Sequence, residues 1–322
     1  MASASLERLA KGVLAGDPDA IADTLGRVED VRPESLPDQR ELIRQLERET
    51  PAAHSVVGLT GPPGAGKSTL AAALIRHWLD ERQGVGMAAV DPSSRRSGGA
   101  LLGDRARLRF DPGERVFVRS MAARDHLGGL APATRAAVVV LRAAYEWTLV
   151  ETVGVGQSEV DVATVADAVT LVLQPGSGDT LQFMKAGILE IPDVFVVHKW
   201  DLGEPARRTR ADLEAMLALS PGAADGWTPP VLGVSAQSGA GVAELAASLR
   251  AQRAWLDDTH TLEPRRRASR RAWALELFER RYGSLGLERL GGRDAAARAC
   301  DASGGTALDA FAALADAAAL ES

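Results

Sequence analysis

The eight residues at positions 61 to 68, Gly-Pro-Pro-Gly-Ala-Gly-Lys-Ser, constrain the fold of this chain more than any other segment. They fit the pattern G-x4-G-K-S/T and come just after an apolar run from Val56 to Leu59. This pattern is typical of a strand that ends in a glycine-rich loop, whose backbone N–H groups wrap around a phosphate. A helix should begin at Lys67, because its positive end then faces the same phosphate. The sequence therefore predicts a strand, a phosphate-binding loop and a helix in this order.

The side chains of this loop suit a nucleotide with magnesium. Lys67 is expected to reach the β- and γ-phosphates, and Ser68 to ligate Mg²⁺. Lysine occurs only at Lys11, Lys67, Lys185 and Lys199, and all other basic residues are arginine. A compact ammonium can approach a phosphate in a way that a planar guanidinium cannot, which is a physical reason for lysine to persist here. We expect nucleotide contacts from Gly61, Pro62, Pro63, Gly64, Ala65, Gly66, Lys67, Ser68 and Thr69.

The pattern around the loop predicts an α/β fold. Short β-branched runs alternate with amphipathic segments from residue 55 to about residue 257, and this alternation favours a mostly parallel sheet covered by helices on both faces. We expect a P-loop NTPase fold with helical extensions at the N- and C-terminal ends. The expected regions are an N-terminal extension at 1–50, the nucleotide-binding domain at 51–257 and a C-terminal helical region at 258–322. The expected strands are 56–60, 85–90, 116–118, 148–150, 169–173, 194–197 and 231–234, and helices are expected at 68–82, 132–145, 179–188, 205–219 and 242–256.

Composition excludes several classes of protein. With 322 residues, 46% of them hydrophobic, the chain can bury a sizeable core, which excludes a disordered or collagen-like chain. The longest apolar runs are far shorter than the ~20 residues that span a bilayer, so we expect no membrane segment. Residues 1–12 lack the apolar stretch of a secretory signal, which favours a cytoplasmic location. Cys300 is the only cysteine, which excludes an internal disulfide or a cysteine-based zinc site within this chain.

The charge distribution gives no general attraction to nucleic acid, because the net charge is −6. One basic run stands out near the C-terminal end. Its arginines lack interleaved aromatic residues, so a solvated helix face is favoured and a contact surface is the alternative. The run consists of Arg265, Arg266, Arg267, Arg270 and Arg271.

A second motif indicates which base is bound. His198, Lys199, Trp200 and Asp201 follow an expected strand, at the place where guanine-specific proteins carry N-K-x-D. A carboxylate at Asp201 can accept hydrogen bonds from N1 and N2 of guanine, which adenine does not offer, while the Lys199 stem lies along the purine. His198 stands where Asn is usual. Further along, backbone N–H groups of the segment Ser235, Ala236 and Gln237 are expected to contact guanine O6.

Candidate sensors of the γ-phosphate lie between these two motifs. Glu151 ends an expected strand, with Gly154 three residues later, so Glu151 is expected to hold Mg²⁺ or its water. Val155 occupies the position where a hydrolytic Gln is often found, which predicts slow unassisted hydrolysis. Asp91 and Asp104 flank a polar, glycine-rich segment and are candidates for the metal shell, with turn capping as the alternative for each.

A third loop starts at Pro175 and leads into a helix with Lys185, for which a plain helix start with a solvated lysine is the alternative. Together with D-P-S-S-x2-S-G-G-x3-G-D at 91–104 and E-T-V-G-V-G-Q-S-E at 151–159, this loop closely resembles one family. It is the MeaB/ArgK (MMAA-like) family of P-loop GTPases, the G-protein chaperones of adenosylcobalamin-dependent acyl-CoA mutases. By this resemblance Asp91, Asp104 and Glu151 map to metal and switch positions, and Lys185 maps to a third switch. The resemblance also implies four catalytic residues, which are Lys67, Asp104, Glu151 and Lys185.

The resemblance implies a homodimeric GTPase, with GTP/GDP and Mg²⁺ as cofactors and the C-terminal helices helping dimerisation. It would gate cofactor delivery to an acyl-CoA mutase of the methylmalonyl-CoA mutase type, or of a related type such as 2-hydroxyisobutyryl-CoA mutase, and protect that enzyme. No D-x-H-x-x-G signature is present, so cobalamin is expected on the mutase. Three alternatives stay open: a nucleotide-binding scaffold with little turnover, a metal-delivery GTPase and a P-loop kinase.

Overall fold

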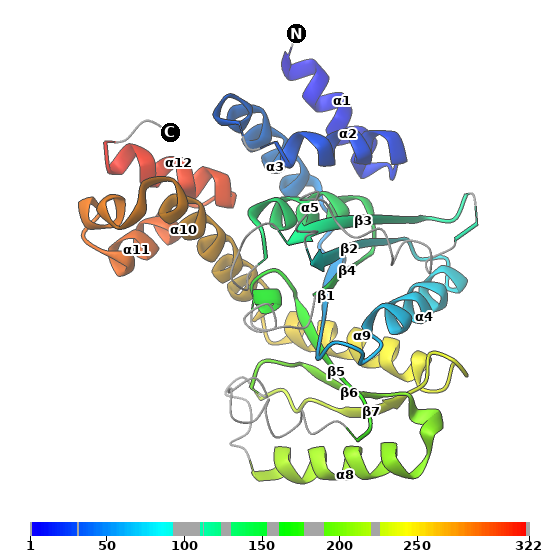
Figure 1. Cartoon of the computed structure of the whole chain (residues 1–322). Helices are drawn as coiled ribbons and strands as arrows, with labels where there is room; N and C mark the ends of the chain where they lie inside the picture. The colour runs from blue at the N-terminus through cyan, green and yellow to red at the C-terminus, as the bar shows by residue number, and fades with distance from the viewer. Residues whose placement is uncertain are drawn as a thin grey trace. The chain divides into compact units, whose positions relative to one another are not determined.

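The computed structural model places most of the chain in two compact units, and each is taken by itself (Figure 1). The first unit comprises 1–52, 132–144 and 261–322, and the second comprises 53–131 and 145–260. The structure describes residues 2–30, 32–92, 110–111, 113–123, 130–152, 161–176, 190–219 and 226–319.

The second unit is built on a seven-stranded sheet in which every described pair of neighbouring strands is parallel, as the alternating pattern predicts. Parallel strands with both faces covered read as continuous apolar runs, which is why β-branched segments marked them in the sequence. The order across the sheet is β3-β2-β4-β1-β5-β6-β7. The strands are β1 (Ser55–Thr60), β2 (Val85–Pro92), β3 (Val116–Ala123), β4 (Trp147–Glu151), β5 (Ala168–Leu173), β6 (Val194–His198) and β7 (Val231–Val234).

Helices cover both faces of this sheet because successive strand residues point to opposite sides. In β5, Leu171 and Leu173 belong to an apolar cluster with α8 (Glu204–Leu219). Val172, between them, belongs to a second cluster with α4 (Lys67–Asp80) and α9 (Val242–Asp258). Short 3-10 turns lie at η2 (Val162–Thr164) and η4 (Trp200–Leu202).

The strand order brings the sequence motifs to one edge of the sheet. β1 lies between β4 and β5, and after β1 the chain continues to β2, on the far side of β4. Ligands of open parallel sheets bind outside the carboxyl ends of the strands, where the strand order reverses direction. The glycine-rich loop follows β1, Glu151 ends β4, and the guanine motifs follow β6 and β7.

The first unit is helical and combines both ends of the chain. The C-terminal helices group with the N-terminal helices and with α5. Apolar faces explain this grouping, since Phe278, Cys300, Phe311 and Leu314 are buried in one cluster. The helices are α1 (Ala2–Leu14), α2 (Pro18–Val28), α3 (Leu36–Glu49), α5 (Pro132–Ala144), α10 (Leu262–Arg289), α11 (Arg293–Ser303) and α12 (Ala307–Ala317), with a 3-10 turn η1 (Pro33–Ser35) before α3.

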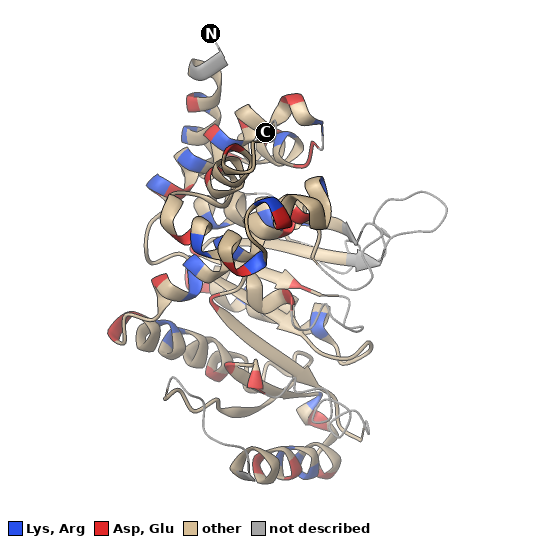
Figure 2. Cartoon of the chain, turned by 90° about the vertical axis from the view of Figure 1, so that its left-hand side faces the viewer, with Lys and Arg blue, Asp and Glu red and all other residues tan. Residues whose placement is uncertain are grey.

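Charged side chains of both signs are mixed along the helices. Figure 2 shows acidic and basic residues alternating along α8, which carries Arg207, Arg210 and Glu214 among others. Among the residues that the structure describes, no helix has the length and apolar character needed to cross a bilayer.

Candidate nucleotide site

The loop after β1 has the backbone conformation that its glycines make possible. Gly61, Gly64 and Gly66 have φ values of 138°, 79° and 93°, which residues with a Cβ rarely adopt. A Cβ on Gly61 would also collide with the carbonyl oxygen of Val172 in the neighbouring strand. Both constraints explain why glycine is needed here. The loop ends where α4 begins, at Lys67, as the motif predicts.

Lys67 points back into this loop. Its side chain is 7% exposed, and its Nζ donates hydrogen bonds to the carbonyl oxygens of Gly61 at 2.8 Å and Pro62 at 3.2 Å. The ammonium is therefore held beside the N-terminus of α4, and the partial positive charge of that helix end also attracts anions. This arrangement concentrates positive charge where the sequence predicts the phosphates.

Ser68 and Glu151 form the pair of oxygen donors expected for magnesium. The hydroxyl of Ser68 donates to Oε1 of Glu151 at 2.6 Å, and Glu151 is paired with Leu59 in the register of β4 and β1. One hydroxyl and one carboxylate, with phosphates and waters completing the shell, are what Mg²⁺ prefers in nucleotide sites. The two side chains thus fit this ion. Among the described residues, no group of three or more His, Cys, Asp or Glu could hold a metal.

His198 joins the phosphate loop to the loop after β7. It is 4% exposed, its Nδ1 lies 2.9 Å from the carbonyl oxygen of Ala65, and the N–H of Ala236 donates to its Nε2 at 3.4 Å. A carbonyl only accepts, so Nδ1 carries the proton and Nε2 is free to accept, which is the pattern of a neutral imidazole. Burial lowers the pKa of His198 and favours this form. A Cβ on Gly66 would collide with the imidazole.

Asp201 is exposed but is held in place by Ser235. The Ser235 hydroxyl, 1% exposed, donates to Oδ1 of Asp201 and accepts a bond from the backbone N–H of Ser238 at 3.3 Å. The hydrogen bond from Ser235 lowers the pKa of Asp201. An ionised, oriented carboxylate with solvent access can accept hydrogen bonds from one ring N–H and one exocyclic amino group of a base.

Lys199 lies between the base motif and the phosphate loop. Its backbone is left-handed, with φ of 57°, and its Nζ donates to the carbonyl oxygen of Gly64 at 3.1 Å and to Oε1 of Gln174 at 2.8 Å. The sequence analysis missed Gln174. Its position directly after β5, at the edge where the other motifs gather, is the signal that could have identified it.

The structure therefore brings together the predicted residues of the phosphate loop, from Gly61 to Thr69, with His198, Lys199, Asp201 and the segment from Ser235 to Gln237. Contacts join the two groups at Ala65 and Gly64. Other predictions lie outside the described residues: Asp104, Lys185, the segment 153–160 and the side chain of Asp91, whose backbone lies near the end of β2. The expected helix at 179–188 lies outside them as well.

Comparisons with known proteins agree on one group. The model of the family described as "Methylmalonyl Co-A mutase-associated GTPase MeaB" matches residues 21–285. A protein of Mycobacterium tuberculosis named "Probable GTPase" is 39% identical over 278 residues, covering 85% of this chain and 82% of the relative. The mouse "Methylmalonic aciduria type A homolog, mitochondrial" is 35% identical over 288 residues, covering 85% of this chain and 69% of the relative.

One solved structure extends the likeness to the fold. The crystal structure of a "LAO/AO transport system kinase" superposes with a TM-score of 0.72 at 25% identity, covering 93% of this chain and 90% of that one. The likeness therefore spans almost the full length of both chains.

Proposed function

This chain belongs to the MeaB family of methylmalonyl-CoA mutase-associated GTPases, and on that premise we propose that it is a GTP-hydrolysing chaperone of an adenosylcobalamin-dependent acyl-CoA mutase. It would gate cofactor delivery to this mutase and protect it from inactivation. One observation supports the proposal: His198 contacts both the phosphate loop, at Ala65, and the loop after β7, at Ala236, and Lys199 contacts the phosphate loop at Gly64. Through these contacts, a change at the phosphates of a bound nucleotide could alter the loops that would hold its base.

Different residues of the site would bind the phosphates, the base and the metal ion. Lys67 and the N-terminus of α4 would neutralise the phosphates, and Asp201, oriented by Ser235, would distinguish guanine from adenine. Ser68 and Glu151 would hold Mg²⁺, which when bound neutralises charge on the β- and γ-phosphates. Hydrolysis would be slow without a partner, because Val155 stands where a water-orienting Gln is often found.

We further propose how hydrolysis is coupled to the mutase. GTP would order the segments 91–104, 151–159 and 175–185, and hydrolysis would release them, as in other nucleotide switches. If the mutase contacts these segments, each partner alters the affinity or turnover of the other. In this proposal residues 51–257 form the GTPase domain, 1–50 an N-terminal extension and 258–322 a helical region that contributes to a homodimer, and the protein acts in the cytoplasm.

The test is single-turnover GTP hydrolysis by the full chain, alone and with a stoichiometric acyl-CoA mutase. We expect a rate well below one per second alone and a clear acceleration with one mutase. Methylmalonyl-CoA mutase and 2-hydroxyisobutyryl-CoA mutase should be compared, because this comparison identifies the partner type. A fast rate without any mutase would contradict the slow switch. No hydrolysis under either condition would favour the scaffold, which Val155 makes the second candidate.

A further inference from the structure

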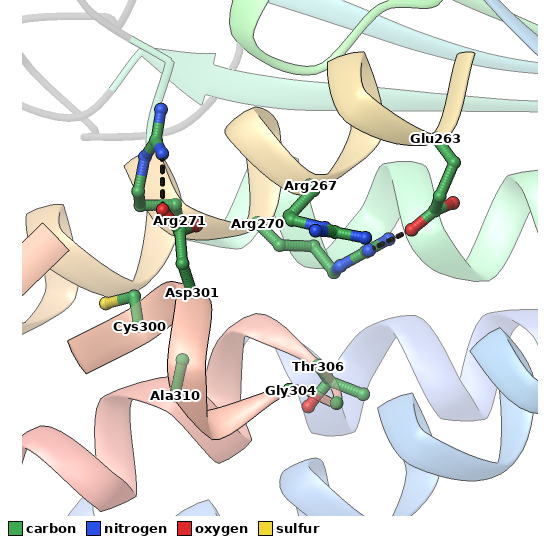
Figure 3. A pocket seen from close by; sticks show the side chains of 10 residues that line it. Glu263, Arg267, Arg270, Arg271, Cys300, Asp301, Gly304, Thr306 and Ala310 are labelled. Atoms are coloured by element: carbon green, nitrogen blue, oxygen red, sulfur yellow. Dashed lines mark hydrogen bonds and ion pairs between the residues drawn. The ribbon is translucent and has the colours of Figure 1, made fainter. Parts of the chain in front are cut away.

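Three arginines of α10 that have no part in the nucleotide site line a cavity of about 340 Å³ in the helical unit (Figure 3). Arg267, Arg270 and Arg271 are three and four residues apart, so they share one face of the helix. The opposite side is formed by Cys300, Asp301 and the two glycines that follow α11. Cavities of this size are in the range of small-molecule pockets.

The cavity holds more guanidinium groups than carboxylates. Arg271 Nη1 donates to Oδ2 of Asp301 at 2.7 Å, and Arg270 pairs with Glu263. Arg267 forms no ion pair or hydrogen bond with any residue that the structure describes. Figure 3 shows its guanidinium extending in the same direction as that of Arg270. Like charges at this helical spacing repel one another and destabilise the helix.

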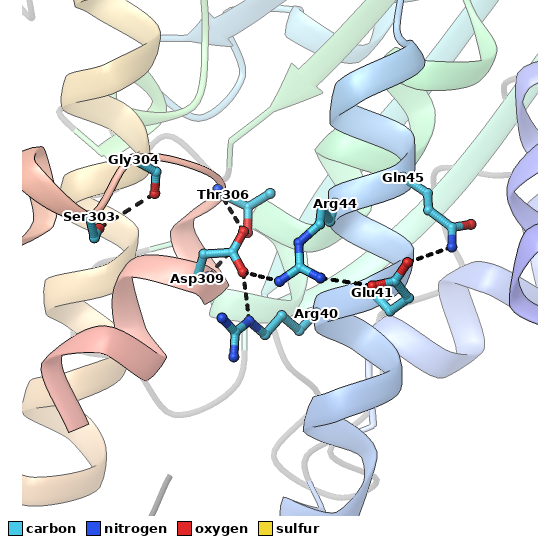
Figure 4. Close-up of polar contacts among 8 residues, drawn as sticks. All are labelled: Arg40, Glu41, Arg44, Gln45, Ser303, Gly304, Thr306 and Asp309. Carbon is cyan, nitrogen blue, oxygen red and sulfur yellow. Dashed lines mark hydrogen bonds and ion pairs between the residues drawn. The ribbon is translucent and has the colours of Figure 1, made fainter. Parts of the chain in front are cut away.

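Two further carboxylates of the helical unit have arginine partners. Glu47 interacts with Arg270 and also pairs with Arg142 at 4.0 Å. Asp309 accepts from Nε of Arg40 at 2.6 Å and also from Arg44 of α3 (Figure 4). Burial raises the pKa of the Cys300 thiol to about 11, so this group adds no negative charge. Among the described residues, the guanidinium group of Arg267 therefore has no matching acceptor.

We propose that this cavity binds a small anion that carries a phosphate group. Planar guanidinium groups match the oxygens of phosphate with two parallel hydrogen bonds each, and a dianion balances closely spaced arginines better than a single carboxylate does. The site lies wholly within the helical unit and uses none of the residues that would bind the nucleotide. The sequence left two interpretations of the arginine run, a solvated helix face and a contact surface. The proposed site favours the contact surface, with a small anion as the ligand.

The test uses the full chain saturated with Mg²⁺ and a non-hydrolysable GTP analogue, so that the phosphate loop is filled. Radiolabelled inorganic phosphate is titrated by equilibrium dialysis at constant ionic strength. We expect one saturable site per chain and a roughly tenfold loss of affinity in Arg267→Gln, since one charge-assisted contact is removed. Arg298→Gln is the matched control, because Arg298 is an exposed arginine of α11 that does not line the cavity.

An unchanged affinity in Arg298→Gln completes the expected result, and circular dichroism of both variants confirms their fold. Absence of a saturable phosphate site in the unaltered protein would overturn the proposal. Equal losses in both variants, or no loss in either, would also overturn it, because the binding would then be non-specific or located elsewhere. Competition with glycerol 3-phosphate identifies the source of the phosphate group: tighter binding than orthophosphate indicates a phosphate ester, and weaker binding indicates free phosphate.

Discussion

The Nδ1 atom of His198 lies 2.9 Å from the carbonyl oxygen of Ala65, so the residue that replaces the usual Asn of the base motif contacts the phosphate loop. Its other ring nitrogen accepts from the N–H of Ala236. A single buried side chain therefore braces the two loops that would enclose the nucleotide. The imidazole can do this because it has a donor on one side and an acceptor on the other.

Removing this brace should weaken nucleotide binding. His198→Ala eliminates two hydrogen bonds of about 1 kcal/mol each, so we expect GDP affinity to fall by roughly tenfold or more. His198→Asn keeps one donor and one acceptor and should stay within a few-fold of the unaltered protein. Calorimetry measures both, with His260→Ala, at an exposed histidine, as the control. If His198→Ala bound GDP as the unaltered protein does, the bracing role would be wrong.

The same contact predicts a dependence on pH. A protonated imidazole has no acceptor for the Ala236 N–H, and burial lowers the pKa of His198 below its usual 6.5. The charges that face it are Lys199, which lowers this pKa further, and Asp201, which raises it. GDP affinity and stability should be level above pH 6.5 and should fall as the pH drops through the pKa of the folded state.

This dependence is measured by titrating GDP affinity from pH 8 to pH 5 in the unaltered protein and in His198→Asn. Since Asn does not titrate, the variant should show a flatter profile over the same range. Parallel decreases in the two proteins would assign the effect to a group other than His198.

The magnesium pair gives a third prediction. Glu151→Gln keeps the shape of the side chain and an oxygen for the Ser68 hydroxyl, but it removes the charge that would hold Mg²⁺. We expect the Mg²⁺ concentration needed for half-maximal GTP hydrolysis to rise by about tenfold or more, with an unchanged melting temperature. Glu244→Gln, at an exposed position of α9, is the control. An unaltered Mg²⁺ requirement would show that Glu151 does not serve the metal.

In the helical unit, the carboxylate of Asp309 connects α12, near the C-terminal end of the chain, to α3, near the N-terminal end. Burial acts to raise the pKa of Asp309, but hydrogen bonds from Arg44, Arg40 and Thr306 hold it well below its usual range. Asp309→Asn should therefore lower the free energy of unfolding by about 1–3 kcal/mol, while Asp316→Asn, exposed on the same helix, should have little effect.

The sign of the pH effect follows from this direction. Because the folded-state pKa of Asp309 is depressed, its contribution is complete above the usual value of 3.8 and is lost as the pH falls through the folded-state pKa. Urea unfolding at pH 7 and at pH 3 measures it, and the difference between Asp309→Asn and the unaltered protein should shrink at pH 3. A difference that is equal at both pH values would show that Asp309 stabilises the unit through shape alone.

The sequence predicted the sheet and the phosphate loop because these features are local. A buried parallel strand such as β5 must be apolar throughout, and the glycines of the loop carry a conformation that other residues avoid. The contact of His198 with Ala65 joins residues 133 positions apart, so no local sequence pattern predicts it. The same holds for Asp309 and Arg40, which are 269 positions apart, and for the grouping of the terminal helices with α5. These long-range contacts depend on which helix and strand faces pack together. The periodicity of apolar residues does not specify that packing.

The central claim is that Asp201, held by Ser235 and connected to the phosphate loop through His198, recognises guanine. The most direct measurement is the dissociation constant of GDP and of ADP by calorimetry on the full chain. If Asp201 recognises guanine, GDP should bind at least ~100-fold tighter than ADP, a difference of about 2.7 kcal/mol. Equal affinities for GDP and ADP would contradict it, because the carboxylate would then not be distinguishing the two bases.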